Sequence, residues 1–195
     1  MRLLLALILL VTSPTLAFAH TGHGTPMTLL AGLSHPLAGL DHVLAMLVVG
    51  IFAAVLGGRA LFLVPLSFLT MMIAGFALGV AQIGLPYVEL AIALSSVVIG
   101  LAAALKRPLP LAGAMALVGS FALFHGHAHG AEMPAGGDAL NYALGFTAAT
   151  AMICTTGVAA TQTLRRLTGR HGANLVRAAA ATGALMGAGV LAGWI

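Results

Sequence analysis

Long apolar stretches, separated by short breaks that contain glycine, proline or charged residues, dominate this chain. Each stretch has about 20 residues, the length that an α-helix needs to cross the hydrocarbon core of a bilayer. The pattern therefore predicts an all-α membrane protein, a bundle of six transmembrane helices. The predicted spans are Leu33–Leu56, Ala60–Val80, Val88–Leu105, Leu109–His125, Leu140–Ala160 and Leu175–Ile195.

The N-terminal segment has a different pattern. It combines a positively charged start, an apolar core from Leu3 to Val11 and a small-x-small motif that ends at Ala19. These features predict a secretory signal peptide over residues 1–19, cleaved after Ala19; the alternative is an uncleaved first span. Cleavage would place His20 and His23 beside a free amine. Either these groups collect a divalent metal or the segment is a flexible polar tail.

The composition supports one membrane-embedded domain over residues 20–195. Hydrophobic residues make up 61% of the chain and charged residues 6%, and the mean hydropathy is +1.10. This leaves no room for a separate aqueous catalytic domain. Basic residues confined to short loops indicate membrane orientation and not a nucleic-acid partner. The single cysteine excludes an intramolecular disulfide.

Glycine pairs four residues apart predict faces for close helix packing in the lipid bilayer. They are Gly75 with Gly79, Gly183 with Gly187, and Gly189 with Gly193.

The distribution of charge predicts the orientation of the spans. With the mature N-terminus outside, the inner loops hold every lysine and arginine after Arg2, whereas the outer segments hold Glu89, Glu132 and Asp138. This asymmetry follows the positive-inside rule and agrees with the side that a signal peptide requires. Spans one to three and four to six then have opposite orientations, as in inverted-repeat transporters. The two halves share no visible sequence similarity.

Two groups of histidines and carboxylates interrupt the apolar spans. In span one the histidines are His35 and His42. If this span is a continuous helix, the two lie nearly two turns apart and face the same way. In the second group His127 points away from its neighbours, towards another helix or water. Topology places both groups in the outer half of the membrane, so we expect them to meet. The members are His35, Asp41 and His42 in span one, and His125, His127, His129 and Glu132 at the end of span four.

Ionisable groups within a span are costly and therefore indicate a functional site; the alternative is that they only cap or bridge helices. Imidazole and carboxylate suit nickel, cobalt, zinc and copper, and the absence of a central thiolate argues against copper(I). No phosphate-binding loop for ATP occurs, so a gradient, a proton or the membrane potential would drive transport. In span five, Thr147, Thr150 and Cys154 share a face that either lines a path or bonds to neighbouring helices.

Two segments carry a resemblance to a known family: His35-Pro36-x-x-Gly39-x-Asp41-His42 and Phe124-His125-Gly126-x-Ala128-His129-Gly130-x-Glu132 resemble the paired motifs of HupE/UreJ proteins. The resemblance covers essentially the whole mature chain. It implies a multi-pass protein of the bacterial inner membrane, with both mature termini in the periplasm, that accompanies hydrogenase or urease genes and acts as a secondary nickel permease, sometimes for cobalt. The metal path it implies consists of His35, Asp41, His42, His125, His129 and Glu132.

One position departs from the family pattern. Members often have a histidine in span five where this chain has Cys154. Either Cys154 ligates the metal as a thiolate, or the change from histidine alters the selectivity or rate of transport. His127 is additional to the motif. We expect Ni²⁺ as cargo and no prosthetic group, no enzymatic activity, and either a monomer or a homo-oligomer.

Two other classes of function remain open from the sequence. The first is an intramembrane zinc-dependent metalloenzyme with Asp41 or Glu132 as general base, although no His-Glu-x-x-His motif occurs. The second is a membrane haem protein with paired axial histidines on facing helices.

Overall fold

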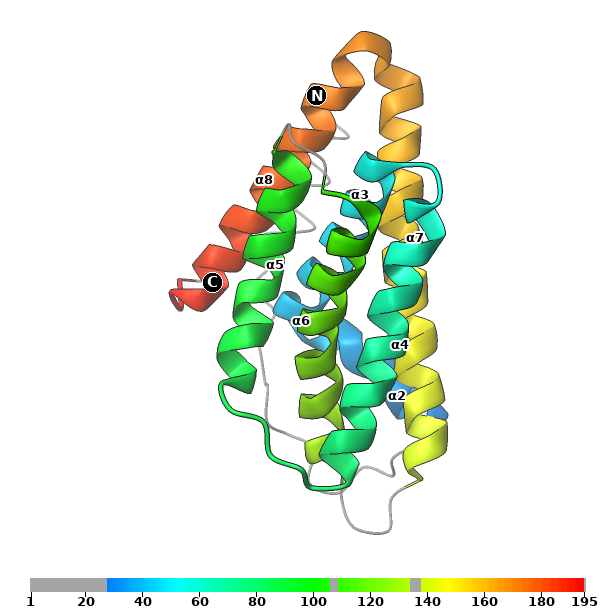
Figure 1. Ribbon diagram of the computed structural model, residues 1–195, viewed down its shortest axis with the longest axis vertical. Coiled ribbons are helices and arrows are strands. Elements are labelled where there is room, and N and C mark those ends of the chain that lie inside the picture. Colours follow the sequence, from blue (N-terminus) through cyan, green and yellow to red (C-terminus); the bar gives the residue numbers. More distant parts are fainter. Residues whose placement is uncertain (1–27, 106–108, 134–137, 195) are drawn as a thin grey trace.

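The computed structural model describes residues 28–105, 109–133 and 138–194, and within these ranges every regular element is a helix. The helices pack side by side in an elongated bundle (Figure 1). The predicted signal peptide, His20 and His23 lie outside the described residues. In chain order the elements are α2 (Leu29–Ala38), α3 (Leu40–Leu56), α4 (Ala60–Val80), α5 (Val88–Ala104), α6 (Leu111–Ala131), α7 (Ala139–Thr168), the 3₁₀ turn η1 (Gly169–His171) and α8 (Gly172–Leu191).

Helix length and composition show a multi-pass membrane protein. In the described part of the chain, α4, α6, α7 and α8 are each long and apolar enough to span a bilayer, and α2 with α3 adds a fifth if this pair is one bent span. The remaining predicted span corresponds to α5, which is apolar but has only 17 residues. The structure therefore supports four to five spans by this measure, and six stays a prediction.

The first predicted span is not a continuous helix. α2 ends at Ala38, α3 begins at Leu40, and the two helices are bent by 87°. Gly39 lies at the break in an extended conformation, with φ −106° and ψ 122°. Pro36 lies inside α2, and its ring, which lacks an N–H, destabilises helix around it. The prediction that His35 and His42 face the same way through helical periodicity is therefore wrong, because the bend sets their relative position.

Helices α4 and α6 pack along each other with their backbones nearly in contact (Figure 1). A Cβ atom on Gly75 would overlap the carbonyl oxygen of Leu123, and one on Gly126 would overlap that of Met72. Only glycine permits this approach. The predicted packing face at Gly75 and Gly79 is confirmed.

The two glycine pairs of α8 have different roles. Gly183 packs against Val48 of α3, and Gly187 packs against Ser96 of α5, which confirms this packing face. Gly193 lies beyond the end of α8 with φ +68°, and its Cβ position has no heavy atom within 4 Å. It is a turn residue, so the packing prediction for Gly189 with Gly193 is wrong at its second member.

The ends of the bundle differ in charge. The α3–α4 turn, which holds Arg59, and the α7–η1–α8 turn lie at one end, opposite the C-terminal end of α6 (Figure 1). Arg165 of α7 donates from Nη1 to the carbonyl oxygen of Ala54 at 2.8 Å, so it caps the last turn of α3 with a cation. At the opposite end Asp138 caps α7: it accepts hydrogen bonds from the backbone N–H and side-chain amide of Asn141, which lower the pKa of this exposed carboxyl.

The packing of α4 against α6 yields a stability prediction. We expect Gly126→Ala to lower the free energy of unfolding by about 1–3 kcal/mol, the usual cost of overpacking, because the new methyl group would collide with backbone that cannot rotate away. The measurement is the melting temperature of the purified protein in detergent. Gly113→Ala on the same helix is the control, since its nearest neighbour, Pro110 Cγ, lies 3.5 Å from the Cβ position. Equal melting temperatures for both variants would contradict this account of the interface.

Candidate metal centre

Four imidazole rings, from α2, α3 and α6, meet inside the bundle. The ring centroids of His35 and His129 are 4.6 Å apart, those of His42 and His129 are 4.9 Å apart, and those of His42 and His125 are 5.0 Å apart. We call His35, His42, His125 and His129 the histidine cluster. The expectation that the two sequence groups meet is confirmed, because the rings of His35 and His42, on either side of the break at Gly39, both lie against His129 in the last turn of α6.

Aromatic rings pack against the histidine cluster from two other helices. Phe68 of α4 lies 6.0 Å from His125, and Phe146 of α7 lies 5.3 Å from His129, between ring centroids. Tyr142 of α7 lies 5.8 Å from His35. Sequence reasoning did not single out these residues, because an aromatic side chain in an apolar span carries no signal that separates a site wall from ordinary packing.

Asp41 fixes the ring of His42. Asp41 Oδ1 accepts the backbone N–H of His42 and lies 2.9 Å from His42 Nδ1. Because a carboxylate can only accept, Nδ1 carries the proton of the neutral ring and the lone pair is on Nε2. A carboxylate behind a histidine is the usual support of a metal ligand. A Cβ on residue 39 would lie 2.7 Å from Asp41 Oδ1, so glycine at the break leaves room for this pair.

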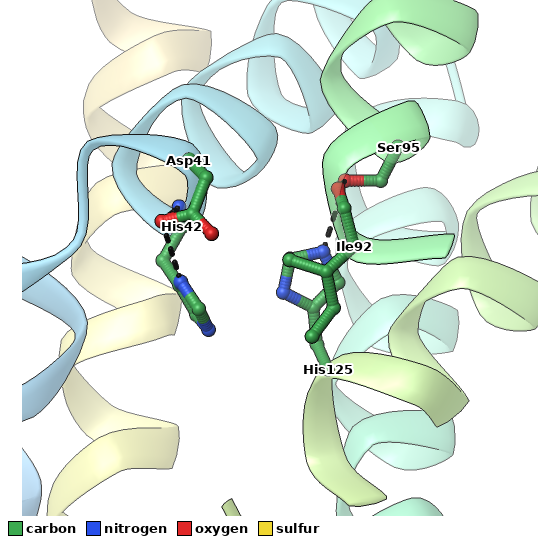
Figure 2. Close-up of polar contacts among 5 residues, drawn as sticks. All are labelled: Asp41, His42, Ile92, Ser95 and His125. Atoms are coloured by element: carbon green, nitrogen blue, oxygen red, sulfur yellow. Dashed lines mark hydrogen bonds and ion pairs between the residues drawn. The ribbon is translucent and has the colours of Figure 1, made fainter. Parts of the chain in front are cut away.

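On the facing helix, His125 is fully buried and lies with Nε2 2.9 Å from Ser95 Oγ of α5. Figure 2 shows the two supported rings opposite each other, Asp41 behind one and Ser95 behind the other. Ser95 was also missed at the sequence level. A serine in a helix commonly bonds to its own preceding turn, so nothing in the sequence distinguishes it from Ser96.

Three imidazole nitrogens of the histidine cluster are buried without a hydrogen-bond partner among the described residues: His42 Nε2, His125 Nδ1 and His129 Nε2. Buried polar atoms of this kind are rare, and each costs about 1–3 kcal/mol. For His42 the unpartnered atom is the lone-pair nitrogen identified above. These nitrogens lie on rings whose centroids are 4.9–5.0 Å from a neighbouring ring of the cluster, and an imidazole lone pair is a donor that a borderline divalent cation accepts.

A carboxylate extends the donor set towards the end of the bundle. His35, His129 and Glu132 each offer a ligand atom, and these atoms lie within 4.8 Å of one another. Glu132 is exposed just beyond α6, whereas His129 is buried. His129 therefore belongs both to this outer group and to the buried cluster. Imidazole with carboxylate is a donor set for borderline divalent metals.

Two predicted residues are not part of this arrangement. His127 donates from Nε2 to the carbonyl oxygen of Ile83 at 2.7 Å. It points away from the histidine cluster, as its helical position predicted, but its partner belongs to the α4–α5 connection and is neither another helix nor water. Cys154 is buried in the apolar core of the bundle and does not join the metal-capable group found in the described ranges. One turn before it, Thr150 donates to Met72 Sδ at 3.8 Å, which favours helix-to-helix bonding for that face of α7.

Comparison with known proteins identifies relatives over almost the whole chain. A family model described as "HupE / UreJ protein" matches residues 7–190. The chain is 44% identical over 180 residues to Protein HupE of Rhizobium leguminosarum bv. viciae, an alignment that covers 92% of each chain. No solved structure matches significantly.

The different surroundings of two neighbouring histidines yield a binding prediction. We expect His129→Ala to weaken Co²⁺ binding at least about tenfold, since loss of even a supporting residue has that effect. We expect His127→Ala to leave binding unchanged, because its ring faces Ile83. Titration of the purified protein with Co²⁺ measures both. Similar losses in the two variants would contradict the assignment of His129 to the centre.

Proposed function

The chain belongs to the HupE/UreJ family, and from this membership we propose that it is a secondary permease that carries a divalent metal, nickel above all, into the bacterial cytoplasm. The imported metal serves maturation of a hydrogenase or a urease. Nickel is cargo in this proposal and no prosthetic group is required; cobalt is the second cargo. Six spans, an inner-membrane location and both mature termini in the periplasm belong to the same proposal.

The observation that carries the proposal is the set of unpartnered nitrogens in the histidine cluster. A dication that leaves water for an apolar bundle needs donors that replace its hydration. Glu132, exposed and close to His35 and His129, offers the first of these. His42 and His125 continue the donor set towards the interior. The ion thus meets an accessible carboxylate before buried imidazoles.

The membrane potential supplies a driving force for import. Moving one elementary charge across the membrane is worth about 2.3 kcal/mol per 100 mV, so a dication gains about twice that amount when the inside is negative. This permits uptake without ATP, which fits a chain with no phosphate-binding loop in its sequence.

The donor chemistry favours nickel, cobalt or zinc over softer ions, and geometry decides among these three. Family membership supports nickel. In the metalloenzyme alternative Asp41 is one of two candidate general bases, but here its carboxylate accepts hydrogen bonds from His42. A carboxylate held by His42 orients a metal ligand and is less available to act as a general base, which favours the permease over the metalloenzyme.

The central prediction concerns uptake by cells. In bacteria that lack their own nickel importers, we expect the wild-type protein to drive accumulation of radioactive nickel. His42→Ala should abolish it, because the variant removes the buried Nε2 donor, and Asp41→Asn should weaken it. His171→Ala is the control, since this exposed histidine lies in η1 at the other end of the bundle. Cobalt and zinc as competitors rank selectivity.

Membrane abundance of each variant is measured alongside uptake. Normal nickel accumulation by a well-expressed His42→Ala variant would remove the proposed site. Absence of accumulation with an abundant wild-type protein would remove the permease itself.

Uptake should also depend on external pH. Metal binding requires neutral imidazoles, and protons compete with the metal for the same lone pairs. We expect the rate to fall as the external pH is lowered, since each proton bound by an imidazole removes a lone pair from the metal. The measurement is initial uptake at fixed free nickel and fixed membrane potential. A rate that rises steadily down to about pH 5 would contradict capture by histidine.

A further inference from the structure

Ser95 contacts the histidine cluster from behind, on a helix that contributes none of its imidazoles. The side chain is completely buried on α5. Its hydroxyl donates to the carbonyl oxygen of Ile92 at 2.6 Å, and the same Oγ lies 2.9 Å from His125 Nε2 (Figure 2). These two contacts determine where the protons lie.

A serine hydroxyl has one proton, and a carbonyl oxygen has none to donate. Two oxygens 2.6 Å apart require a proton between them, so we assign the Ser95 proton to the Ile92 carbonyl, which leaves Oγ to accept from His125. His125 therefore carries its proton on Nε2, and the lone pair of its neutral ring is on Nδ1. This Nδ1 is one of the buried nitrogens without a partner in the described structure.

His42 has the opposite arrangement. Its Nδ1–H is directed to Asp41, which leaves the lone pair on Nε2. The rings of His42 and His125 are nearly perpendicular, with centroids 5.0 Å apart. Two different supports, on opposite sides of the cluster, therefore leave the nitrogen that faces away from each support as the available donor.

We propose that Ser95 is a positioning residue that holds His125 in the Nε2-protonated tautomer and so presents Nδ1 to the transported dication. This inference rests on the proposed permease function. Ser95 acts through His125 and does not itself ligate the metal. A neutral hydroxyl raises the donor strength of an imidazole less than a carboxylate does, so this support orients His125 without making the ion harder to release.

The test uses the purified full-length protein with Co²⁺ alone as probe, because the absorption spectrum of Co²⁺ reports its ligands. We expect Ser95→Ala to weaken Co²⁺ binding about tenfold and to change the spectrum. Ser95→Thr, which keeps the hydroxyl, should restore both. Ser96→Ala is the matched control: Ser96 is the next residue, also buried, but its Oγ packs against Gly187 of α8. We expect wild-type affinity and spectrum from it.

A second measurement does not depend on how the variants fold. In wild-type protein labelled with ¹⁵N-histidine, nuclear magnetic resonance distinguishes protonated from unprotonated ring nitrogens, and the His125→Gln spectrum assigns the signals. We expect His125 to be protonated on Nε2 and unprotonated on Nδ1 in the metal-free protein.

The proposal is overturned by a His125 ring protonated on Nδ1, by unchanged Co²⁺ binding and spectrum in Ser95→Ala, or by equal losses in Ser95→Ala and Ser96→Ala. None of these readouts uses transport. If wild-type protein binds Co²⁺ but cells accumulate no nickel, the permease proposal fails. The positioning role of Ser95 is still tested in that case, by the protonation of the His125 ring nitrogens in the nuclear magnetic resonance spectrum.

Discussion

The structure depends on holding imidazole lone pairs in a place where nothing in the described protein satisfies them. His42, His125 and His129 each bury one unpartnered nitrogen, at a cost of roughly 3–9 kcal/mol for the three together. The aromatic rings and apolar side chains that surround the cluster offer these nitrogens no hydrogen bond. Helix packing contributes to offsetting the cost. The backbones of α4 and α6 are nearly in contact, which requires glycine at positions 75 and 126. This packing holds the two histidines of α6 in place although their unpartnered nitrogens destabilise the folded state.

The break at Gly39 affects the electrostatics of the histidine cluster as well as its geometry. The N-terminus of α3 begins beside the cluster, and a helix N-terminus carries a partial positive charge that repels a cation. Asp41, in the first turn of α3, puts a full negative charge at this point. The C-terminal ends of α2 and α6 lie near the same cluster and carry partial negative charge. A continuous helix through residue 39 would supply neither the end of α2 nor the bend that brings His35 to His129. Discontinuous helices of this kind are a recurrent feature of transporter binding sites.

Much of this centre could be predicted from the sequence because ionisable residues are conspicuous in apolar spans. Because burying an ionisable group in a span costs free energy, His35, His42, His125 and His129 stood out as candidates for a functional site. The alternating direction of the spans then predicted that these histidines lie on the same side and meet. The bend was missed because hydrophobicity reports burial and not backbone direction; Pro36 and Gly39 were its only visible signals. Ser95 was missed because it has the same residue type, helix and burial as Ser96, and only tertiary contact separates them. The short α5 could be recognised as apolar, but its 17 residues do not establish a complete span.

The unequal supports behind His42 and His125 bear on how a permease avoids becoming a metal trap. A site built from several equally strong donors would hold a dication too tightly to release it. Here Asp41 gives His42 a charged partner, whereas Ser95 gives His125 a neutral one that already donates to Ile92. The ring with the charged partner lies at the break of the first span, and the ring with the neutral partner lies on the facing helix. The two neighbouring rings, with centroids 5.0 Å apart, therefore have supports of unequal strength, which is what the proposed transport requires if the ion is to leave the site.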